Sequence, residues 1–304
     1  MNLTKIHSIT KKILVAFLGG FLLLFILFHA SANLLILRED DGAWYSAFCH
    51  FMGTNYIVKV FELLLFLTLI FHIIITLWLA YTNYKARGTV RYHERSRTKT
   101  HSGSKLMAWT GALILCLLVV HFFHFYFVKM DIVEGQYMVE QKEFNEQAVK
   151  NPQVQSVLQM AQMFKASPAE IAKQDSSMTQ LVPFFAFVDK VYTSNMLSED
   201  GKWIKGITPE EKKMLKANFE KMEVEPDFYT MARQEFKNPL MVILYLIFFV
   251  VLFIHMRHAF PSAFQTLGLN NYTYNKALDV CGLIYAIVVC LMFTVTVLGV
   301  CFFV

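Results

Sequence analysis

The sequence predicts an all-α membrane protein with five transmembrane helices and a long, partly helical, polar insertion between the third and the fourth helix. Hydrophobic residues make up 56% of the 304 residues, and charged residues only 17%, against about 25% in a typical soluble domain. Five stretches without Asp, Glu, Lys or Arg are long enough to span a membrane, which takes about 20 residues. The expected spans are Ile13–Leu37, Leu63–Tyr84, Leu106–Val128, Asn238–Met256 and Val280–Val304.

The first stretch is expected to be a span and not a cleaved signal peptide. It is too long for the apolar core of a signal peptide, and no small-residue cleavage site ends it. Five spans place the N-terminus and the C-terminus on opposite sides of the membrane.

Lys and Arg predict the orientation, because they collect in the loops on the cytoplasmic side. They are concentrated before the first span and in the loop Lys85–Lys105, so we expect both segments, and the N-terminus, to be cytoplasmic. The insertion would then be extracytoplasmic, as would the C-terminus, in the inner (cytoplasmic) membrane of a cell. Most of the 23 acidic residues lie in this insertion. The net charge of +5 therefore reflects an asymmetry across a membrane and does not indicate binding of nucleic acid. The basic loop is explained by orientation alone, and docking of a cytoplasmic partner is the alternative.

We divide the chain into residues 1–130 with spans one to three, the insertion at residues 131–237, and residues 238–304 with spans four and five. A capping box at Thr208–Glu211 predicts a helix in the insertion that runs to about Met222. Asn151 is the expected N-cap of a second helix, Pro152–Lys165, and Asn238 has the same position at the start of span four.

The cysteines exclude several cofactor classes. The chain has five cysteines but no CxxCH and no CxxC pair, so covalent haem attachment and iron–sulfur or zinc ligation are not expected. We interpret the cysteines as small apolar residues of the spans and of one outer loop.

Histidines inside the spans are the candidates for chemistry, because ionisable groups are costly in a membrane. A single such histidine is most simply a buried side chain bonded to a neighbour. Four separate helices contribute here, which favours shared ligation over four unrelated contacts. Six of the ten histidines lie in or at the ends of spans: His29, His72, His121, His124, His255 and His258.

The depth of these histidines predicts two pairs. At 1.5 Å per residue, His29 lies roughly 24 Å and His121 roughly 22 Å from the inner ends of spans one and three. His72 lies roughly 18 Å from the inner side, and His255 roughly 12 Å if its helix continues to about Ala263. The odd spans thus supply one pair near the outer side, and the even spans supply a second pair nearer the inner side.

Two haems, each held by two histidines, would use all four residues. Zinc or iron without haem is the rival, but such sites in helix bundles usually add carboxylates, and only Glu62 and Asp279 lie near span ends. Small residues such as Ala30, Ala32 and Gly111 would let a flat macrocycle approach a helix, although small residues also serve helix packing.

Several segments together carry a family resemblance. They are His29–Asn33 in span one, Ala43–Met52 before span two, Phe71–His72 and Ala80–Thr82 in span two, Thr110–Gly111 with His121 ten residues after the glycine in span three, and His255–Gly268 in span four. In their order and spacing they resemble the dihaem cytochrome b subunit of succinate:quinone oxidoreductases, the group of succinate dehydrogenase and fumarate reductase. The resemblance covers all five spans, whereas the insertion is longer than in that family.

The resemblance implies two haem b groups. His72 and His255 would be the iron ligands of a proximal haem near the partner subunits, and His29 and His121 those of a distal haem. This pairing agrees with the one reached from depth.

His124 and His258 each follow an expected ligand by three residues and so lie near the same helix face. They remain alternative ligands or hydrogen-bond donors beside the haems.

The resemblance also implies partners and a substrate. A flavoprotein that oxidises succinate or reduces fumarate, and an iron–sulfur protein, would bind on the cytoplasmic side. This chain has no GxGxxG and no cysteine cluster, so it would contribute only electron transfer to or from a quinone, with menaquinone expected and no dicarboxylate site of its own. Membrane lipid, and dimerisation of the complex, complete the expected interactions.

Four further residues are candidates of lower rank. Glu62 would relay protons at a quinone site, or is an interfacial side chain near Lys59. His50 would donate a hydrogen bond to a quinone carbonyl. Arg257 and Lys105 would neutralise haem propionates, or are basic anchors on the inner side.

Two other functions remain open from the sequence. A dihaem, quinol-oxidising subunit of another respiratory reductase would use the same four ligands with a different soluble partner. A transporter that uses histidines as proton relays belongs to a different class and would bind no haem.

Overall fold

The computed structural model describes residues 8–87, 102–165, 167–174, 181–194, 196–219, 222–269, 271 and 273–303. The chain divides into two compact units. The membrane unit comprises residues 1–34, 52–120 and 239–299, and the insertion unit comprises residues 35–51, 121–238 and 300–304. Each unit is described by itself.

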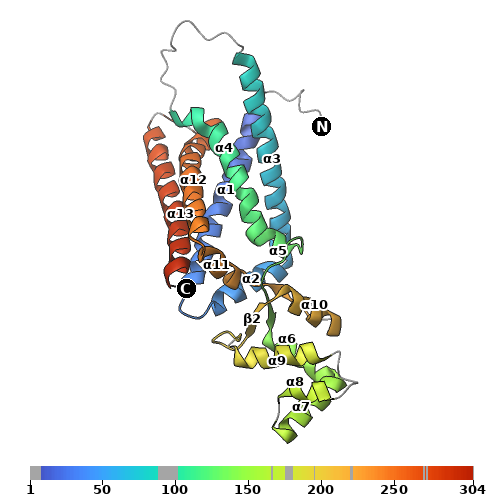
Figure 1. Cartoon of the computed structure of the whole chain (residues 1–304). Helices are drawn as coiled ribbons and strands as arrows, with labels where there is room; N and C mark the ends of the chain where they lie inside the picture. Colours follow the sequence, from blue (N-terminus) through green and yellow to red (C-terminus); the bar gives the residue numbers. More distant parts are fainter. Residues whose placement is uncertain are drawn as a thin grey trace. The chain divides into compact units, whose positions relative to one another are not determined.

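Five helices are long and apolar enough to cross a membrane, which confirms the predicted class of helical, multi-pass membrane protein. They begin and end close to the predicted spans (Figure 1). These helices are α1 (Ser8–Asn33), α3 (Tyr56–Arg87), α4 (Ser102–His121), α12 (Pro239–Thr266) and α13 (Asn275–Phe303).

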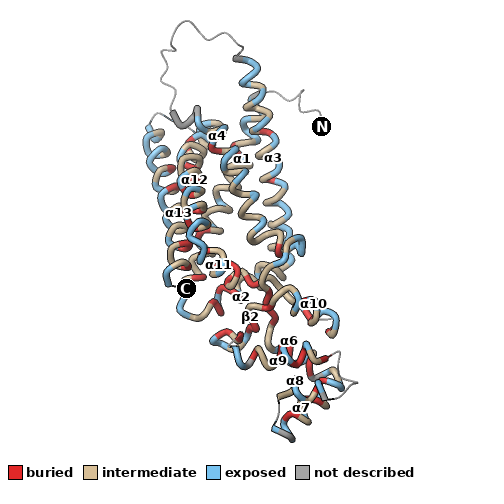
Figure 2. Tube along the Cα trace, in the orientation of Figure 1, coloured by how far each residue is buried: buried red, intermediate tan, exposed pale blue. Residues whose placement is uncertain are grey.

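Helix α1 is the centre of the membrane unit, because it packs against both α3 and α12. The hydroxyl of Tyr285 on α13 donates a hydrogen bond of 2.5 Å to the carbonyl oxygen of Leu23 on α1. A small apolar core lies between these helices, and many other apolar residues of the spans are exposed or partly exposed (Figure 2). An apolar exposed surface is what lipid-facing helices require. The buried residues of this core are Ala30, Leu252, Met256, Ala286 and Val289.

The fourth helix extends beyond the apolar stretch that ends at Met256, as the depth of His255 assumed. It continues through Pro261 to Thr266. The charged Arg257 ends the apolar stretch but not the helix. Pro261 is buried and packs against α13, where a Cβ atom added to Gly282 would lie 3.0 Å from its ring.

The third span contains a change of helix type. Helix α4 ends at His121, the π-helical segment η3 (Phe122–Tyr126) follows, and α5 (Phe127–Lys129) completes the span. π-helical turns are rare and occur mostly at functional sites.

The insertion unit combines helices with a small sheet. Strands β1 (Tyr137–Glu140), β2 (Trp203–Ile207) and β3 (Glu225–Pro226) pair antiparallel in the order β2-β1-β3, with Tyr137 opposite Ile207 and Val139 opposite Ile204. The short helices are η2 (Leu34–Leu37), α2 (Ala43–Thr54), α6 (Gln141–Lys150), α7 (Pro152–Phe164), α8 (Pro168–Gln174), α9 (Val182–Thr193), α10 (Pro209–Asn218) and α11 (Phe228–Phe236). Their buried side chains form a core around Phe184, Phe185, Ile204, Ile207 and Leu215 (Figure 2).

Two of the three predicted helix caps are confirmed. Asn151 accepts hydrogen bonds from the backbone N–H groups of Gln153 and Val154, and Thr208 and Glu211 form the reciprocal capping box. The predicted end of the helix that begins at Thr208 is wrong, because α10 ends at Asn218 and not near Met222. The backbone becomes extended at Phe219, whose side chain turns into the core.

Candidate functional site

His72 on α3 lies against a glycine of α1. A Cβ atom added to Gly19 would be 3.5 Å from Cε1 of His72. The Nδ1 atom of His72 is buried and has no hydrogen-bond partner within the described residues. A buried polar atom without a partner costs about 1–3 kcal/mol, so structural histidines normally acquire one. His72 therefore does not behave as a bonded structural side chain.

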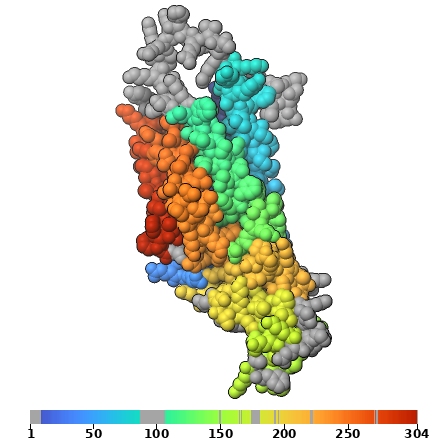
Figure 3. Space-filling view, viewed as in Figure 1, coloured from blue at the N-terminus to red at the C-terminus, as the bar shows by residue number. Residues whose placement is uncertain are grey.

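His255 on α12 lies against α4 in a similar way. A Cβ atom added to Gly111 would be 3.6 Å from Cε1 of His255, and the neighbouring Thr110 hydroxyl oxygen lies 3.1 Å from Nδ1. Figure 3 shows α12 in orange beside α4 in green on the visible face. The imidazole of His255 is also within electrostatic range of His72 and His258.

The two glycines set the height of these rings. Gly19 precedes His29 by ten residues on α1, and Gly111 precedes His121 by ten residues on α4. Ten helical residues rise about 15 Å. The ring of His72 therefore contacts α1 about 15 Å along the helix from His29. The ring of His255 contacts α4 at the same distance along the helix from His121.

His29 sits among aromatic rings in the membrane unit. Its ring stacks on Phe25 at 5.4 Å between centroids and lies 5.8 Å from Phe293 of α13. Asn33, one turn later, donates to the carbonyl oxygen of His29 at 2.7 Å, and its amide nitrogen lies 3.3 Å from Nδ1. The side chain of Asn33 therefore orients the imidazole of His29.

His121 is the last residue of α4 and belongs to the insertion unit. Its ring lies 5.3 Å from that of Phe125 in η3. His29 and His121 thus belong to different units, and their pairing stays a prediction.

His124 lies inside the π-helical segment and pairs with a carboxylate that the sequence did not suggest. Its Nε2 atom lies 3.4 Å from Oε1 of Glu235 on α11, and both side chains are largely withdrawn from solvent. The position of the His124 ring is therefore set by its contact with the Glu235 carboxylate.

His50 is also held by a carboxylate. Its Nδ1 atom lies 3.0 Å and 3.1 Å from the two carboxylate oxygens of Glu225, and its ring lies 5.1 Å from that of Trp203. Burial raises the pKa of Glu225 above its usual value, although the hydrogen bond and the charge of His50 act in the opposite direction. The role of His50 at a quinone carbonyl stays a prediction, and its immediate partner is Glu225.

The remaining candidates lie on three different helices, α3, α12 and α4. Glu62 is half-buried on α3, and Arg257 is exposed on α12, two residues after His255. The side chain of Lys105 and most of the basic loop Lys85–Lys105 lie outside the described residues.

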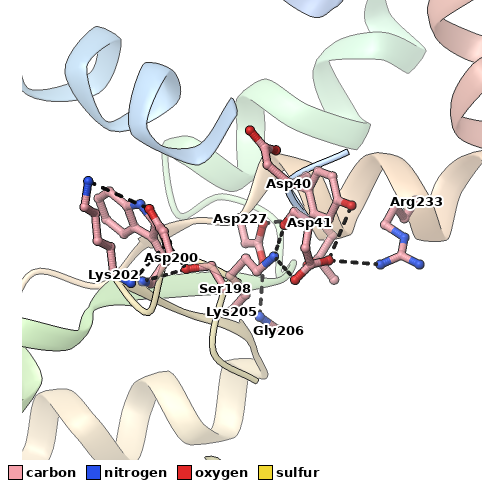
Figure 4. A network of polar contacts seen from close by, with 12 residues as sticks. Asp40, Asp41, Ser198, Asp200, Lys202, Lys205, Gly206, Asp227 and Arg233 are labelled. Atoms are coloured by element: carbon pink, nitrogen blue, oxygen red, sulfur yellow. Dashed lines mark hydrogen bonds and ion pairs between the residues drawn. The ribbon is translucent and has the colours of Figure 1, made fainter. Parts of the chain in front are cut away.

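A second polar cluster joins three segments of the insertion unit (Figure 4). Lys205 of β2 forms an ion pair with Asp41 at 2.8 Å and also donates to the backbone oxygen of Asp41. Arg233 of α11 lies 3.8 Å from the same carboxylate. Beside them Asp227 is fully buried, and burial raises its pKa even though it accepts hydrogen bonds from the N–H groups of Gly206 and Thr230. This cluster fixes the segment before α2 to the sheet and to α11.

Sequence reasoning missed the partners of the histidines. Thr110 was noted for its place beside Gly111, but nothing in the sequence connects it with His255, which lies 145 positions later. Glu225 and Glu235 were two of many acidic residues in the insertion. The signal that could have identified them is their position, because Glu225 lies in a short strand and Glu235 on a short helix that packs against the span.

Comparison of this chain with protein families, with curated proteins and with solved structures gives no match.

Proposed function

We propose that this chain is the haem-bearing, quinone-reactive membrane subunit of a succinate dehydrogenase or fumarate reductase complex. It would pass electrons between an iron–sulfur partner and the quinone pool. The observation that carries the proposal is the pair of matching contacts, His72 on Gly19 and His255 on Gly111. Each glycine lies ten residues, or about 15 Å, before a further histidine of its own helix, which supports two separate haem levels.

The residues of the membrane unit fit haem b at the inner level. At each of the two ring contacts the facing helix presents a glycine, so no side chain of that residue stands between the imidazole and the helix backbone. Nδ1 of His255 has an oxygen partner in Thr110, which leaves Nε2 as the coordinating atom. We assign His72 and His255 to one haem, and His29 and His121 to the other. When bound, haem supplies an iron that accepts and releases one electron at a time.

A metal site without haem receives less support from the side chains. Within the described residues, no three His, Cys, Asp or Glu side chains form a group that could hold a metal ion. Zinc sites need three or four protein ligands, whereas one haem needs two histidines from facing helices.

The proposal includes partners on the cytoplasmic side. A flavoprotein and an iron–sulfur subunit would bind there, a quinone, expected to be menaquinone, would be the electron carrier in the membrane, and Glu62 is a candidate proton relay. The basic loop Lys85–Lys105 and the acidic insertion support this orientation, because positively charged loops remain in the cytoplasm. Labelling of introduced cysteines with an impermeant reagent in intact cells tests it. Labelling of the basic loop with protection of the insertion would reverse the two haem levels.

Gentle purification in detergent tests the function directly. We expect a complex with a flavoprotein and an iron–sulfur protein, a reduced-minus-oxidised spectrum of b-type haem, and succinate–quinone or quinol–fumarate activity. The same haems with a different soluble partner would identify another respiratory reductase. A single chain without haem that transports a solute would overturn the proposal.

A further inference from the structure

We propose that the insertion completes a binding pocket for the headgroup of a quinone or quinol at the end of the third span, with the pair His124 and Glu235 as its polar end. This inference rests on the proposed function, because it names where the electron carrier of that function would bind.

The pocket lies entirely within the insertion unit and has a volume of about 390 Å³. This is within the size range of small-molecule sites, roughly 300–1,000 Å³. One side comes from the last two turns of the third span, including Phe123 and Val128, and the other side comes from Met231 and its neighbours on α11. Helix α11 packs on the π-helical segment, and the insertion supplies eight of the eleven lining residues.

The lining combines six apolar residues or glycine with five polar ones, of which Glu134 pairs with Lys213, and sites for small organic ligands likewise combine apolar walls with polar groups. The ring of Phe123 and the side chains of Val128 and Met231 offer a surface for a flat ring. His124 and Glu235 lie 3.4 Å apart among them, and Gln136 and Gln234 add two amide groups to the wall.

The His124–Glu235 pair can serve both redox forms of such a ring. A protonated imidazole donates a hydrogen bond to a quinone carbonyl, and a carboxylate accepts one from a quinol hydroxyl. Neither a lipid tail nor a sugar has this combination of a flat apolar ring and an oxygen at its end. Three of the lining residues, Phe123, His124 and Val128, belong to the third span.

The π-helical segment explains how His124 reaches this position. One extra residue in the turn changes the direction of every later side chain relative to α4. In a regular helix His124 would lie near the same face as His121. The π-helical turn instead allows His124 to face α11 while His121 remains at the end of α4.

Photolabelling of the purified complex tests the site. The probe is a tail-free azido-naphthoquinone, and the labelled peptides are identified by mass spectrometry. We expect label on the segment Phe122–Val128 or on α11, and protection by excess 2,3-dimethyl-1,4-naphthoquinone but not by oleic acid. Glu235→Gln removes the carboxylate that pairs with His124, the donor to the quinone carbonyl, and should reduce protection about tenfold, the effect of losing a hydrogen bond to a charged group. The matched control Glu199→Gln changes an exposed carboxylate in a turn of the same unit and should have no effect.

The outcomes separate this inference from the proposed function. Label confined to the region of Glu62, in a complex that contains both haems and reacts with quinone, would overturn the pocket but not the function. Label in the pocket of a protein that contains no haem would support the pocket and overturn the dihaem proposal. Equal protection by oleic acid would identify the site as one for lipid tails and overturn the inference. His124→Asn should lower protection as well, with the haem spectrum showing that the variant is folded.

Discussion

The hydroxyl oxygen of Thr110 lies 3.1 Å from Nδ1 of His255 and equally 3.1 Å from the backbone oxygens of Leu106 and Met107. A threonine hydroxyl has one proton, and in a helix this proton goes to a carbonyl one turn back. The oxygen then accepts a hydrogen bond from the Nδ1–H group of His255. The imidazole is thereby held in the tautomer with a free electron pair on Nε2.

Thr110→Val removes this hydrogen-bond acceptor at nearly constant volume. Loss of such a partner typically lowers metal affinity about 10–100-fold, so we expect weaker retention of the inner haem with the outer haem unchanged. Haem content after washing and a redox titration of both haems measure the effect. Thr82→Val is the matched control, because the hydroxyl of Thr82 bonds to Trp78 and Leu79 of its own helix. Equal behaviour of both variants would contradict the assigned role of Thr110.

Replacement of the ligands should reveal the pairs. His29→Ala and His121→Ala should cause the same spectral and redox loss, and His72→Ala and His255→Ala should share a different one. The physical reason is that each low-spin iron needs two axial ligands. Visible and electron paramagnetic resonance spectra of the four variants measure this. Unchanged haem content in all four would end the dihaem hypothesis.

His124→Ala and His258→Ala are the controls for that series and should retain both haems. His124 is paired with Glu235, three residues beyond His121. If either control lost a haem that the neighbouring ligand variant retained, the register would be wrong by one helical turn.

Gly19 should tolerate a small side chain but not a large one. Its Cβ position is 3.5 Å from the ring of His72, which is an ordinary contact, so Gly19→Ala should retain the inner haem. Gly19→Leu extends into the ring and should displace it, with loss of that haem. Gly20→Leu is the matched control, because nothing described lies within 4 Å of a Cβ atom at Gly20. Haem content per chain decides, and loss in Gly20→Leu alone would refute the contact.

Gly42 should be essential for the stability of the insertion unit. Its φ angle is +74°, and the ring of the buried residue Tyr229 occupies the place of a Cβ atom. Gly42→Ala should cost about 1–3 kcal/mol from overpacking, in addition to the strain at positive φ. Gly206→Ala is the control, because Gly206 has a φ of +69° with nothing described within 4 Å of its Cβ position, so it should cause only the strain. Hydrogen exchange of the insertion unit measures both variants, and a smaller loss in Gly42→Ala would contradict the contact.

Asp227 predicts a specific dependence of stability on pH. Burial raises its pKa in the folded chain above the ordinary value of 3.8, so the folded state retains a proton that the unfolded state has released. The stability from this proton is fully present below pH 3.8 and is lost as pH rises through the folded pKa. The neutral side chain of Asp227→Asn has no such dependence. The free energy of unfolding of the wild type should therefore fall relative to that of Asp227→Asn as pH rises, and a rise would refute the argument.

Local rules were sufficient for the helices and their caps. Hydropathy located all five spans, because a lipid environment requires about 20 apolar residues in each. Asn151 and Thr208 marked two helix starts correctly, since a cap depends only on residues within one turn. Hydropathy alone did not give the end of the fourth helix, because a charged residue after Met256 ends the apolar stretch but not the helix.

The sequence by itself therefore determined the number of spans, their approximate positions and the set of histidines that face a membrane environment. Only the tertiary structure decided what each ring contacts. Gly19 with His72, Thr110 with His255 and Glu225 with His50 are contacts between residues 53, 145 and 175 positions apart. The strand pairing of Tyr137 with Ile207 and the π-helical turn at His124 were likewise absent from the sequence patterns. Such contacts depend on how whole helices and strands pack, which no local pattern of residues specifies.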